Sequence, residues 1–369
     1  MASFFKATLS AWNRLHPTVA ATLGGIFCAL LLAASGTQGL VARLDFHAVL
    51  MRGLLPFLLF AGALHVDPPG LRQEGGFIAL LSTAGVVIAT FFVGFALHLG
   101  LGLAGRDVSL PACLLFGALI SPTDPVAVLA IFRRTKVPRS LAITVGAESL
   151  FNDGMAVVMF ASILGAANGA SVSLPRASLL FLTQTGGGLL FGLLLGEIVA
   201  RCVDSVESLP VQLAATAALA FLGYTGANAL HVSGLLAVIL AGIRVGNRSL
   251  RLKAYWVMID GVLNLLVFAL LGLEALAIPW STTAVWAGLL AVPLVLAGRA
   301  VSVAIPMAAL RPWRTFVPGT FRALTWGGLR GAIPLALALN LPASPERALI
   351  LASTYIVGLF SLIVQGSTL

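Results

Sequence analysis

The chain has 369 residues, of which 59% are hydrophobic and only 9% are charged, and its mean hydropathy is +1.03. Soluble domains carry about 25% charged residues, so this composition excludes a soluble protein and indicates one that crosses a membrane several times. The formal net charge of +9 does not indicate nucleic-acid binding, because the basic residues lie in short connections between apolar runs.

Twelve apolar runs follow one another along the chain. They cover residues 17–35, 47–66, 75–99, 109–132, 140–166, 177–200, 210–231, 233–246, 255–278, 283–310, 320–340 and 348–369. Most have the roughly 20 residues that a membrane-spanning helix needs, and 233–246 is short. The sequence therefore predicts an all-α, multi-pass membrane protein of about twelve transmembrane helices, with no soluble domain.

The Lys and Arg residues between the runs are unevenly divided. The N-terminus and the even-numbered loops carry fifteen, namely Lys6, Arg14, Arg72, Arg133, Arg134, Lys136, Arg139, Arg201, Arg244, Arg248, Arg251, Lys253, Arg311, Arg314 and Arg322. The odd-numbered loops carry five, namely Arg43, Arg52, Arg106, Arg176 and Arg347. Because positive loops stay in the cytoplasm, we expect a cell (inner) membrane protein with both termini cytoplasmic.

The first 35 residues have an alternative interpretation. Lys6 and Arg14, an apolar run and then Ala33-Ala34-Ser35 resemble a secretory signal peptide. The run is longer than a typical signal core, and without it the chain would lack the first span of the two five-span repeats described below. We therefore treat it as the first span.

Two of the expected spans are interrupted. The fourth breaks at Ser121-Pro-Thr-Asp-Pro125, and the eleventh at Gly327-Gly-Leu-Arg-Gly-Ala-Ile-Pro334. Matched broken helices in two halves of a chain indicate an inverted-repeat transporter with a site near the membrane midplane. We expect repeats of five spans at 17–166 and 233–369, joined by two linker spans at 177–231.

Each break carries one charged residue, Asp124 in the fourth span and Arg330 in the eleventh. A broken helix exposes the positive end of one half-helix and the negative end of the other. Where two such helices cross, an acid in one and a base in the other can neutralise these ends. We favour this structural role for both residues, with direct ion binding as the alternative.

The fifth span holds Glu148, Ser149, Asn152 and Asp153. The two acids are five residues apart, so their side chains are separated by about 140° around the helix axis. They therefore do not share a face. Glu148 shares a face with Asn152, and Ser149 shares one with Asp153. Carboxylate and hydroxyl oxygens suit a hard cation, so we expect Asp153 and Ser149 to bind one, although Asp153 could also be a hydrogen-bonded structural acid.

Two further residues complete this arrangement. Arg299, near the middle of the tenth span, has no acid at helical spacing, and we expect it to form an ion pair with Glu148 across the helices. Thr123, beside Asp124, can supply another oxygen to the cation. The other acids within spans are interpreted as interfacial (Glu197) or as structural or vestibule-lining (Asp260 and Glu274).

Three stretches together resemble the monovalent cation:proton antiporters of the NhaP/NHE type. They are Gly117–Leu129 (GALISPTDPVAVL), Gly146–Val157 (GAESLFNDGMAV) and Trp326–Leu337 (WGGLRGAIPLAL). The resemblance covers nearly the whole chain. It implies NhaA-like inverted repeats with crossing discontinuous helices, and a homodimer in which a core around spans 3–5 and 10–12 moves against a dimerisation panel.

The resemblance also implies roles for the site residues. Asp153 would be where cation and proton compete, preceded by the neutral Asn152, with Thr123 and Ser149 as supporting oxygen ligands. Glu148 and Arg299 would form the salt bridge of the core, and Arg330 would be the arginine of the second broken helix.

These observations predict a secondary antiporter that exchanges Na⁺ for H⁺ by alternating access, with Li⁺ as a second candidate cation. One carboxylate that alternates between one cation and one proton makes the exchange electroneutral at 1:1. The ions are substrates, and no cofactor is expected. The alternatives are a K⁺/H⁺ antiporter, an ion channel and an intramembrane enzyme, although the last would need a catalytic motif such as His-Glu-x-x-His, which is missing from this sequence.

Overall fold

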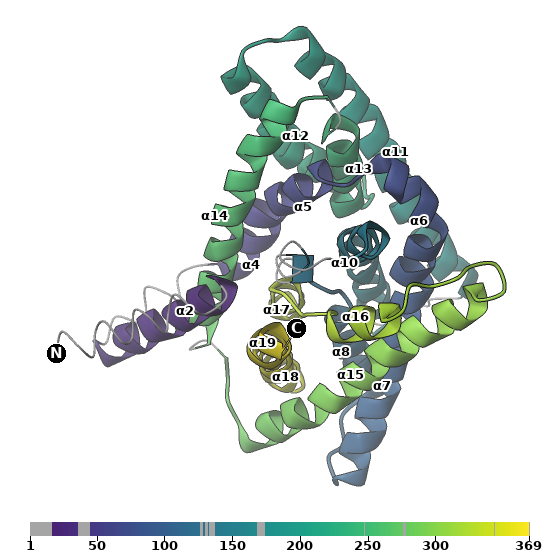
Figure 1. Ribbon diagram of the computed structural model, residues 1–369. Helices are drawn as coiled ribbons and strands as arrows, with labels where there is room; N and C mark the ends of the chain where they lie inside the picture. The colour runs from purple at the N-terminus through teal and green to yellow at the C-terminus, as the bar shows by residue number, and fades with distance from the viewer. Residues whose placement is uncertain are drawn as a thin grey trace.

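The fold is built from helices, as the apolar runs predict. The computed structural model describes residues 17–35, 45–125, 128–129, 132, 137–167, 174–246, 248–275, 278–342 and 344–368, with the side chains of 174–178 left out. The helices are α2 (Pro17–Ala34), α4 (Phe46–Ala48), η1 (Val49–Leu54), α5 (Leu55–Leu64), α6 (Pro68–Leu80), η2 (Leu81–Gly85), α7 (Val86–Leu103), α8 (Leu110–Ile120), α10 (Arg139–Ala167), α11 (Leu174–Ser205), α12 (Leu209–Ala229), α13 (Gly234–Gly246), α14 (Leu250–Glu274), α15 (Thr282–Leu310), α16 (Thr320–Trp326), α17 (Ile333–Leu339), α18 (Arg347–Phe360), η3 (Ser361–Gln365) and α19 (Gly366–Thr368). Figure 1 shows their arrangement. The elements η1, η2 and η3 are π-helical segments inside longer helices.

Among the described residues, nine helices are long and apolar enough to cross a membrane. The protein is therefore a multi-pass membrane protein. The expected runs at 109–132, 233–246 and 320–340 contain shorter helices: α8 and α13, of 11 and 13 residues, and the pair α16 and α17, of seven residues each. Within and just after 109–132, residues 126–127, 130–131 and 133–136 lie outside the described residues, as do residues 1–16.

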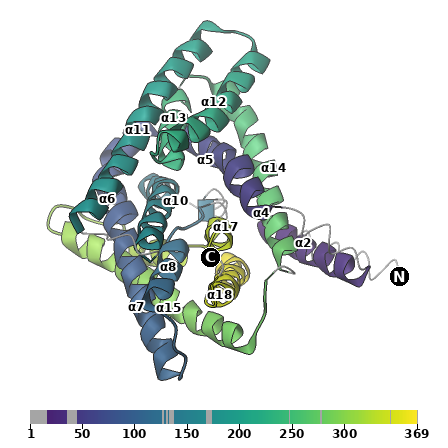
Figure 2. The same cartoon turned by 180° about the vertical axis from the view of Figure 1, so that it is seen from behind.

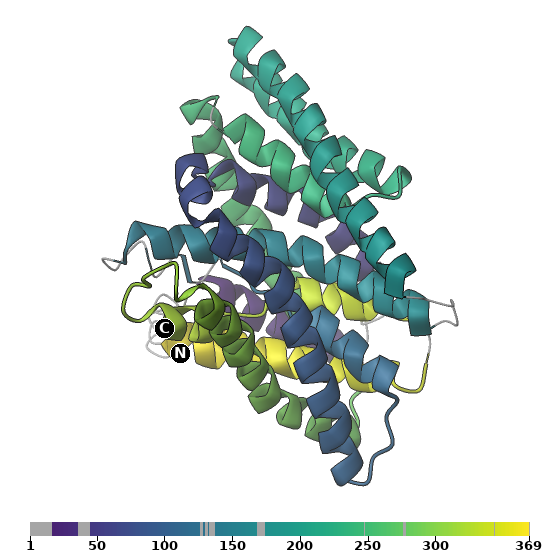
Figure 3. The ribbon, with the colours of Figure 1, turned by 90° about the vertical axis from the view of Figure 1, so that its right-hand side faces the viewer.

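One predicted boundary was wrong. The run expected at 75–99 belongs to a continuous helix of 36 residues, Pro68–Leu103, in which α6, η2 and α7 follow one another (Figure 3). The helix begins early because the Asp67 side chain accepts a hydrogen bond from the Gly70 N–H and Pro68 occupies the first turn. Its first turns are polar, so hydropathy alone did not reveal them.

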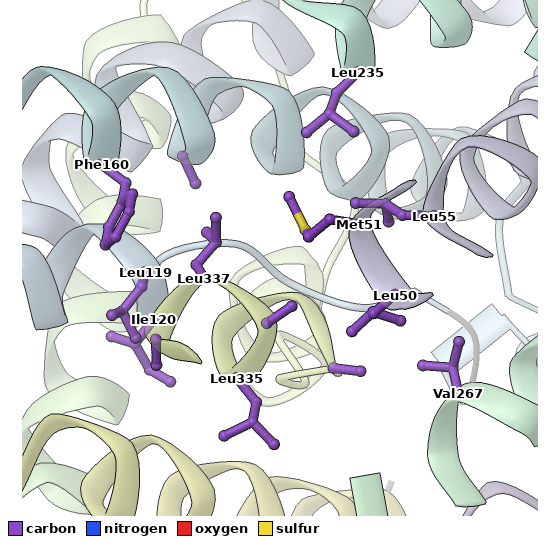
Figure 4. Packing of buried hydrophobic residues seen from close by; sticks show 14 of the residues in the cluster. Leu50, Met51, Leu55, Leu119, Ile120, Phe160, Leu235, Val267, Leu335 and Leu337 are labelled. Atoms are coloured by element: carbon purple, nitrogen blue, oxygen red, sulfur yellow. The ribbon is translucent and has the colours of Figure 1, made fainter. Parts of the chain in front are cut away.

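The helices form two groups, seen from opposite sides in Figures 1 and 2. The panel helices are α2, α5 and α11–α14, and they arch along one flank of the bundle helices, which are α6–α8, α10 and α15–α18. Buried apolar side chains from both groups meet where the groups adjoin. Figure 4 shows Leu50, Leu55 and Val267 on the panel side of this cluster and Leu119, Leu335 and Leu337 on its bundle side.

Helices α2 and α14 of the panel pack with their backbones almost in contact. A Cβ atom added to Gly272 would lie 2.2 Å from the Thr22 carbonyl oxygen, and one added to Gly25 would lie 2.1 Å from that of Ala269. Small residues at a crossing point are a common way for membrane helices to associate.

This crossing gives a first prediction. Gly272→Ala should destabilise the protein by about 1–3 kcal/mol, because the added methyl group overpacks the contact. Gly261→Ala on the same helix is the matched control, since a Cβ there meets open space, and it should leave stability unchanged or slightly raised. Thermal unfolding in detergent compares the two; equal midpoints would contradict the close crossing.

Candidate functional site

The interruption after α8 follows from its two prolines. α8 ends at Ile120, and Pro122 and Pro125 supply no backbone N–H to continue the helical ladder. The Asp124 N–H instead donates to the Leu329 carbonyl oxygen at 2.7 Å, which forms an isolated antiparallel bridge between the two breaks. The two interrupted stretches, 208 residues or so apart in sequence, therefore lie against each other at the centre of the bundle.

The second break lies between α16 and α17 and depends on glycine. A Cβ at Gly331 would lie 2.6 Å from an Asp124 carboxylate oxygen, and one at Gly328 would lie 2.7 Å from Arg299 Nε. Only residues without a side chain allow these two charged groups to come so close to the backbone. Asp124 thereby reaches the chain just before the N-terminus of α17, where a helix carries partial positive charge.

Arg330 makes the reciprocal contact. Its Nη1 donates to the carbonyl oxygens of Ser121 and Pro122, at 2.7 and 2.8 Å, at the C-terminal end of α8. The guanidinium is buried and therefore offsets the partial negative charge of that helix end. The acid and the base thus stand at opposite-signed helix ends, which is the geometry expected for a structural role.

Thr123 is held to α10 by three hydrogen bonds. Its backbone N–H donates to Asn152 Oδ1 at 3.3 Å, Asn152 Nδ2 donates to its Oγ1 at 2.9 Å, and the Ser149 hydroxyl lies 3.0 Å from the same Oγ1. All three residues are buried. Asn152 therefore fixes both the backbone and the hydroxyl of Thr123 at the break.

The ion pair expected between Glu148 and Arg299 is present and bidentate. The Nη1–Oε1 and Nη2–Oε2 distances are 2.5 and 3.0 Å, and Arg299 Nε also donates to the Leu324 carbonyl oxygen at 2.9 Å. The two side chains are 1% and 7% exposed. The pair ties α10 to α15 and to the end of α16.

Asp153 lies on the wall of a cavity of about 510 Å³ between the panel and the bundle. The wall is formed by α5 and α14 on the panel side, and by α10 and both helix breaks on the bundle side. Asp153 is 7% exposed, and within the described ranges no donor lies within hydrogen-bonding distance of its carboxylate. Asp124 lines the same cavity.

Some of the predicted site residues line the cavity, and others lie outside its lining. Asp153, Thr123 and Asp124 line the cavity. Ser149 lies behind Thr123, and the remaining supporting residues, Asn152, Glu148, Arg299 and Arg330, are also outside the lining. Asp260 does line the cavity, with Asn264 Nδ2 donating to its carboxylate at 3.0 Å.

Sequence reasoning missed the ion pair at one end of the cavity. Arg139 Nη2 lies 2.8 Å from Asp67 Oδ2, and both residues line the cavity. The Arg139 side chain is 80% exposed, so the cavity reaches from Asp153 to the surface of the protein. The Asp-Pro-Pro sequence at 67–69 is a helix-start signal that could have drawn attention to Asp67.

A second missed pair joins Glu74 of α6 to Arg314, which follows α15. The Arg314 guanidinium also lies 5.1 and 5.2 Å from the ring centres of Phe77 and Phe316. Glu197, expected to be interfacial, is paired with Arg201 and Arg244.

A buried carboxylate on a cavity between two helix groups, next to crossing helix breaks, defines a membrane transporter of small ions. The sequence profile of the family described as "Sodium/hydrogen exchanger, transmembrane" matches residues 1–369. The chain belongs to the sodium/hydrogen exchanger family, whose members are transporters and not enzymes.

Individual relatives agree with this assignment. The Na(+)/H(+) antiporter NhaP of Pseudomonas aeruginosa is 44% identical over 344 residues, which is 89% of this chain and 81% of that protein. The Na(+)/H(+) antiporter NhaH of Halobacillus dabanensis is 33% identical, covering 88% and 82%. The structure of the sodium proton antiporter MjNhaP1 from Methanocaldococcus jannaschii has the same fold, with a TM-score of 0.75 at 21% identity over 98% of this chain and 92% of that one.

Proposed function

We propose that this protein exchanges Na⁺ for H⁺ across the cell membrane and that Asp153 is the residue where the two ions compete. The observation that carries the proposal is the Asp153 carboxylate, which is buried, lines the cavity and accepts no hydrogen bond within the described part of the chain. An unpaired charge at this depth is costly. Binding one proton or one cation removes that cost, and the carboxylate cannot hold both stably.

The neighbouring oxygens can complete a sodium site. Thr123 presents its hydroxyl from the first break and lines the same cavity as Asp153. Asn152 fixes its position, and Ser149 adds a second hydroxyl 3.0 Å from that of Thr123. We assign Thr123 as a ligand of the cation. Ser149 is a second ligand, which needs a small shift toward the cavity, and Asp124 is an alternative carboxylate ligand.

Alternating access would carry this site from one side of the membrane to the other. One apolar cluster runs from Leu50 and Leu55 on the panel side to Leu335 on the bundle side, and apolar surfaces have few directional bonds to break when two groups shift. We propose that the bundle moves against the panel, and that inverted repeats at 17–166 and 233–369, with linker spans at 177–231, generate the two orientations. Both termini would be cytoplasmic.

A homodimer would keep the panel fixed while the bundle moves. The panel exposes large apolar side chains, among them Leu182, Leu222 and Met258, at 64%, 61% and 70%. A second copy or lipid can cover such a surface. We propose that the panel helices form the dimer contact.

The experiment that tests the function measures proton movement in proteoliposomes after a cation is added against an imposed pH gradient. Na⁺ should dissipate the gradient, and Li⁺ should do so as well. Dissipation by K⁺ alone would replace the assignment with a K⁺/H⁺ antiporter. Ion flux without coupled proton movement would indicate a channel and overturn the proposal.

Transport is expected to be electroneutral, which is a second prediction. Glu148 is paired with Arg299 and Asp124 lies at a helix end, so Asp153 alone is assigned to alternate between one proton and one monovalent cation. A membrane potential acts on net moved charge at about 2.3 kcal/mol per charge per 100 mV, and here that charge is zero.

The measurement is the rate of Na⁺/H⁺ exchange in proteoliposomes whose potential is clamped with K⁺ and valinomycin. The rate and the final Na⁺ gradient should be the same at all imposed voltages. A voltage-dependent gradient would mean that a second group carries a proton, and Asp124 and then Asp260 would be the first to test.

A further inference from the structure

A pocket away from the ion site combines apolar and cationic walls. It has a volume of about 400 Å³ and is lined by residues of the middle of α11, of the second half of α13 and just beyond it, and of the start of α6. Leu193, Leu240 and Ile243 form one part of its lining, Arg244 and Arg248 form another, and Pro68 of α6 completes it. A site with this division fits a molecule that is itself part apolar and part anionic.

The arginines around the pocket outnumber their acidic partners. Arg201, Arg244 and Arg248 share two carboxylates, those of Glu197 and Asp204, which leaves one positive charge in excess. Arg244 donates from Nε to Glu197. Within the described residues its two Nη groups make no further hydrogen bond, so they remain available to the oxygens of a phosphate.

The apolar wall continues onto a surface suited to acyl chains. Leu190, Leu194 and Ile198 of α11 are 59%, 59% and 60% exposed, and Leu193, which lines the pocket, is 43% exposed. These residues belong to a helix long and apolar enough to cross the membrane. Arg251 and Lys253 follow α13 closely in the chain, and the excess of positive loop residues places this end at the cytoplasmic leaflet.

We propose that this pocket binds the headgroup phosphate of an anionic phospholipid of the cytoplasmic leaflet, with Arg244 and Arg248 as its ligands and the acyl chains along α11. The bound lipid would also touch Pro68, which belongs to the bundle, whereas α11 and α13 belong to the panel. Pro68 follows Asp67, whose ion pair with Arg139 stands at the end of the ion cavity. The lipid would therefore bridge the two helix groups beside the expected cytoplasmic opening.

The test is binding, and it does not depend on whether the protein exchanges sodium for protons. Purified protein in mixed micelles is titrated with phosphatidylglycerol or with phosphatidylcholine, and lipid retention is measured by native mass spectrometry, with the unfolding midpoint as a second measurement. Wild type should retain phosphatidylglycerol and gain stability from it in preference to phosphatidylcholine.

The variant Arg244→Gln/Arg248→Gln should need roughly 25-fold more phosphatidylglycerol for half-saturation, since each surface arginine contributes roughly a fivefold factor to binding of anionic lipid. Arg72→Gln/Arg322→Gln is the matched control, because it removes the same charge from two exposed arginines on the same expected side. Arg244→Lys/Arg248→Lys keeps the charge and should recover part of the affinity.

Three results would overturn the proposal. The first is equal retention of phosphatidylglycerol by the Arg244→Gln/Arg248→Gln variant and its control. The second is equal stabilisation by inorganic phosphate in phosphatidylcholine micelles, which would indicate a site for a free anion. The third is a change from dimer to monomer in the Gln variant irrespective of lipid, which would show that a second copy of the chain covers the pocket.

Discussion

Asp153→Asn is expected to abolish Na⁺-driven proton movement while leaving the protein folded. An amide has nearly the shape of a carboxylate, but it neither carries the exchanged proton nor supplies the negative charge that holds a dehydrated cation. No hydrogen bond to the Asp153 carboxylate is found within the described ranges, so the substitution breaks no contact there. The measurement is exchange in proteoliposomes at matched protein density, together with the unfolding midpoint of each purified protein.

Asp260→Asn is the control for this prediction. Asp260 lines the same cavity from α14, so its substitution removes one negative charge from the cavity without touching the proposed site. We expect this variant to need more Na⁺ for half-maximal exchange but to remain active. Exchange at the wild-type rate in Asp153→Asn would contradict the assignment of Asp153. Complete loss of exchange in Asp260→Asn, with Asp153→Asn still active, would show that the ion site is on the panel side.

The central part of the site was predictable because its chemistry is local in sequence. Two prolines around Asp124 indicate a broken helix, and the spacing of Glu148, Ser149, Asn152 and Asp153 assigns side chains to faces of α10. The Glu148–Arg299 pair could be inferred although 151 residues separate its members, because each lies deep in an apolar run that offers no charge of opposite sign at helical spacing, so each needs a partner from another helix.

The pairs at the ends of the helices could not be found in this way. Asp67 and Arg139 are 72 residues apart, and Glu74 and Arg314 are 240 residues apart. All four lie at or near the connections between spans, where water satisfies a charge without a partner and no energetic argument selects one pairing over another. Their positions follow from how the helices pack.

The same limit applies to geometry within the site. Sharing a helix face with Asp153 suggested that Ser149 would reach the ion directly. The structure places the Ser149 hydroxyl 3.0 Å from that of Thr123, where the first break crosses α10, so Ser149 stays a proposed ligand that would need a small shift to reach the cavity. Helical spacing gives the direction of a side chain, but only tertiary packing shows what stands in front of it.

Glu148→Gln is expected to lower stability more than almost any other single exchange of a charged side chain in this protein. Removing one partner from a buried ion pair typically costs about 3–5 kcal/mol, because the remaining charge is left buried without compensation. Arg299 would be that charge: its side chain is 7% exposed, and both Nη groups now donate to Glu148. The measurements are the folded yield and the unfolding midpoint in detergent.

Two further variants separate this explanation from a general sensitivity of the fold. Arg139→Gln disrupts an ion pair whose arginine side chain is 80% exposed, and exposed pairs contribute only about 0–1 kcal/mol, so its midpoint should stay near wild type. The double variant Glu148→Gln/Arg299→Gln removes both buried charges and should recover part of the stability lost in Glu148→Gln alone. If the double variant were instead less stable than Glu148→Gln, the guanidinium of Arg299 would be held mainly by the Leu324 carbonyl oxygen and not by Glu148.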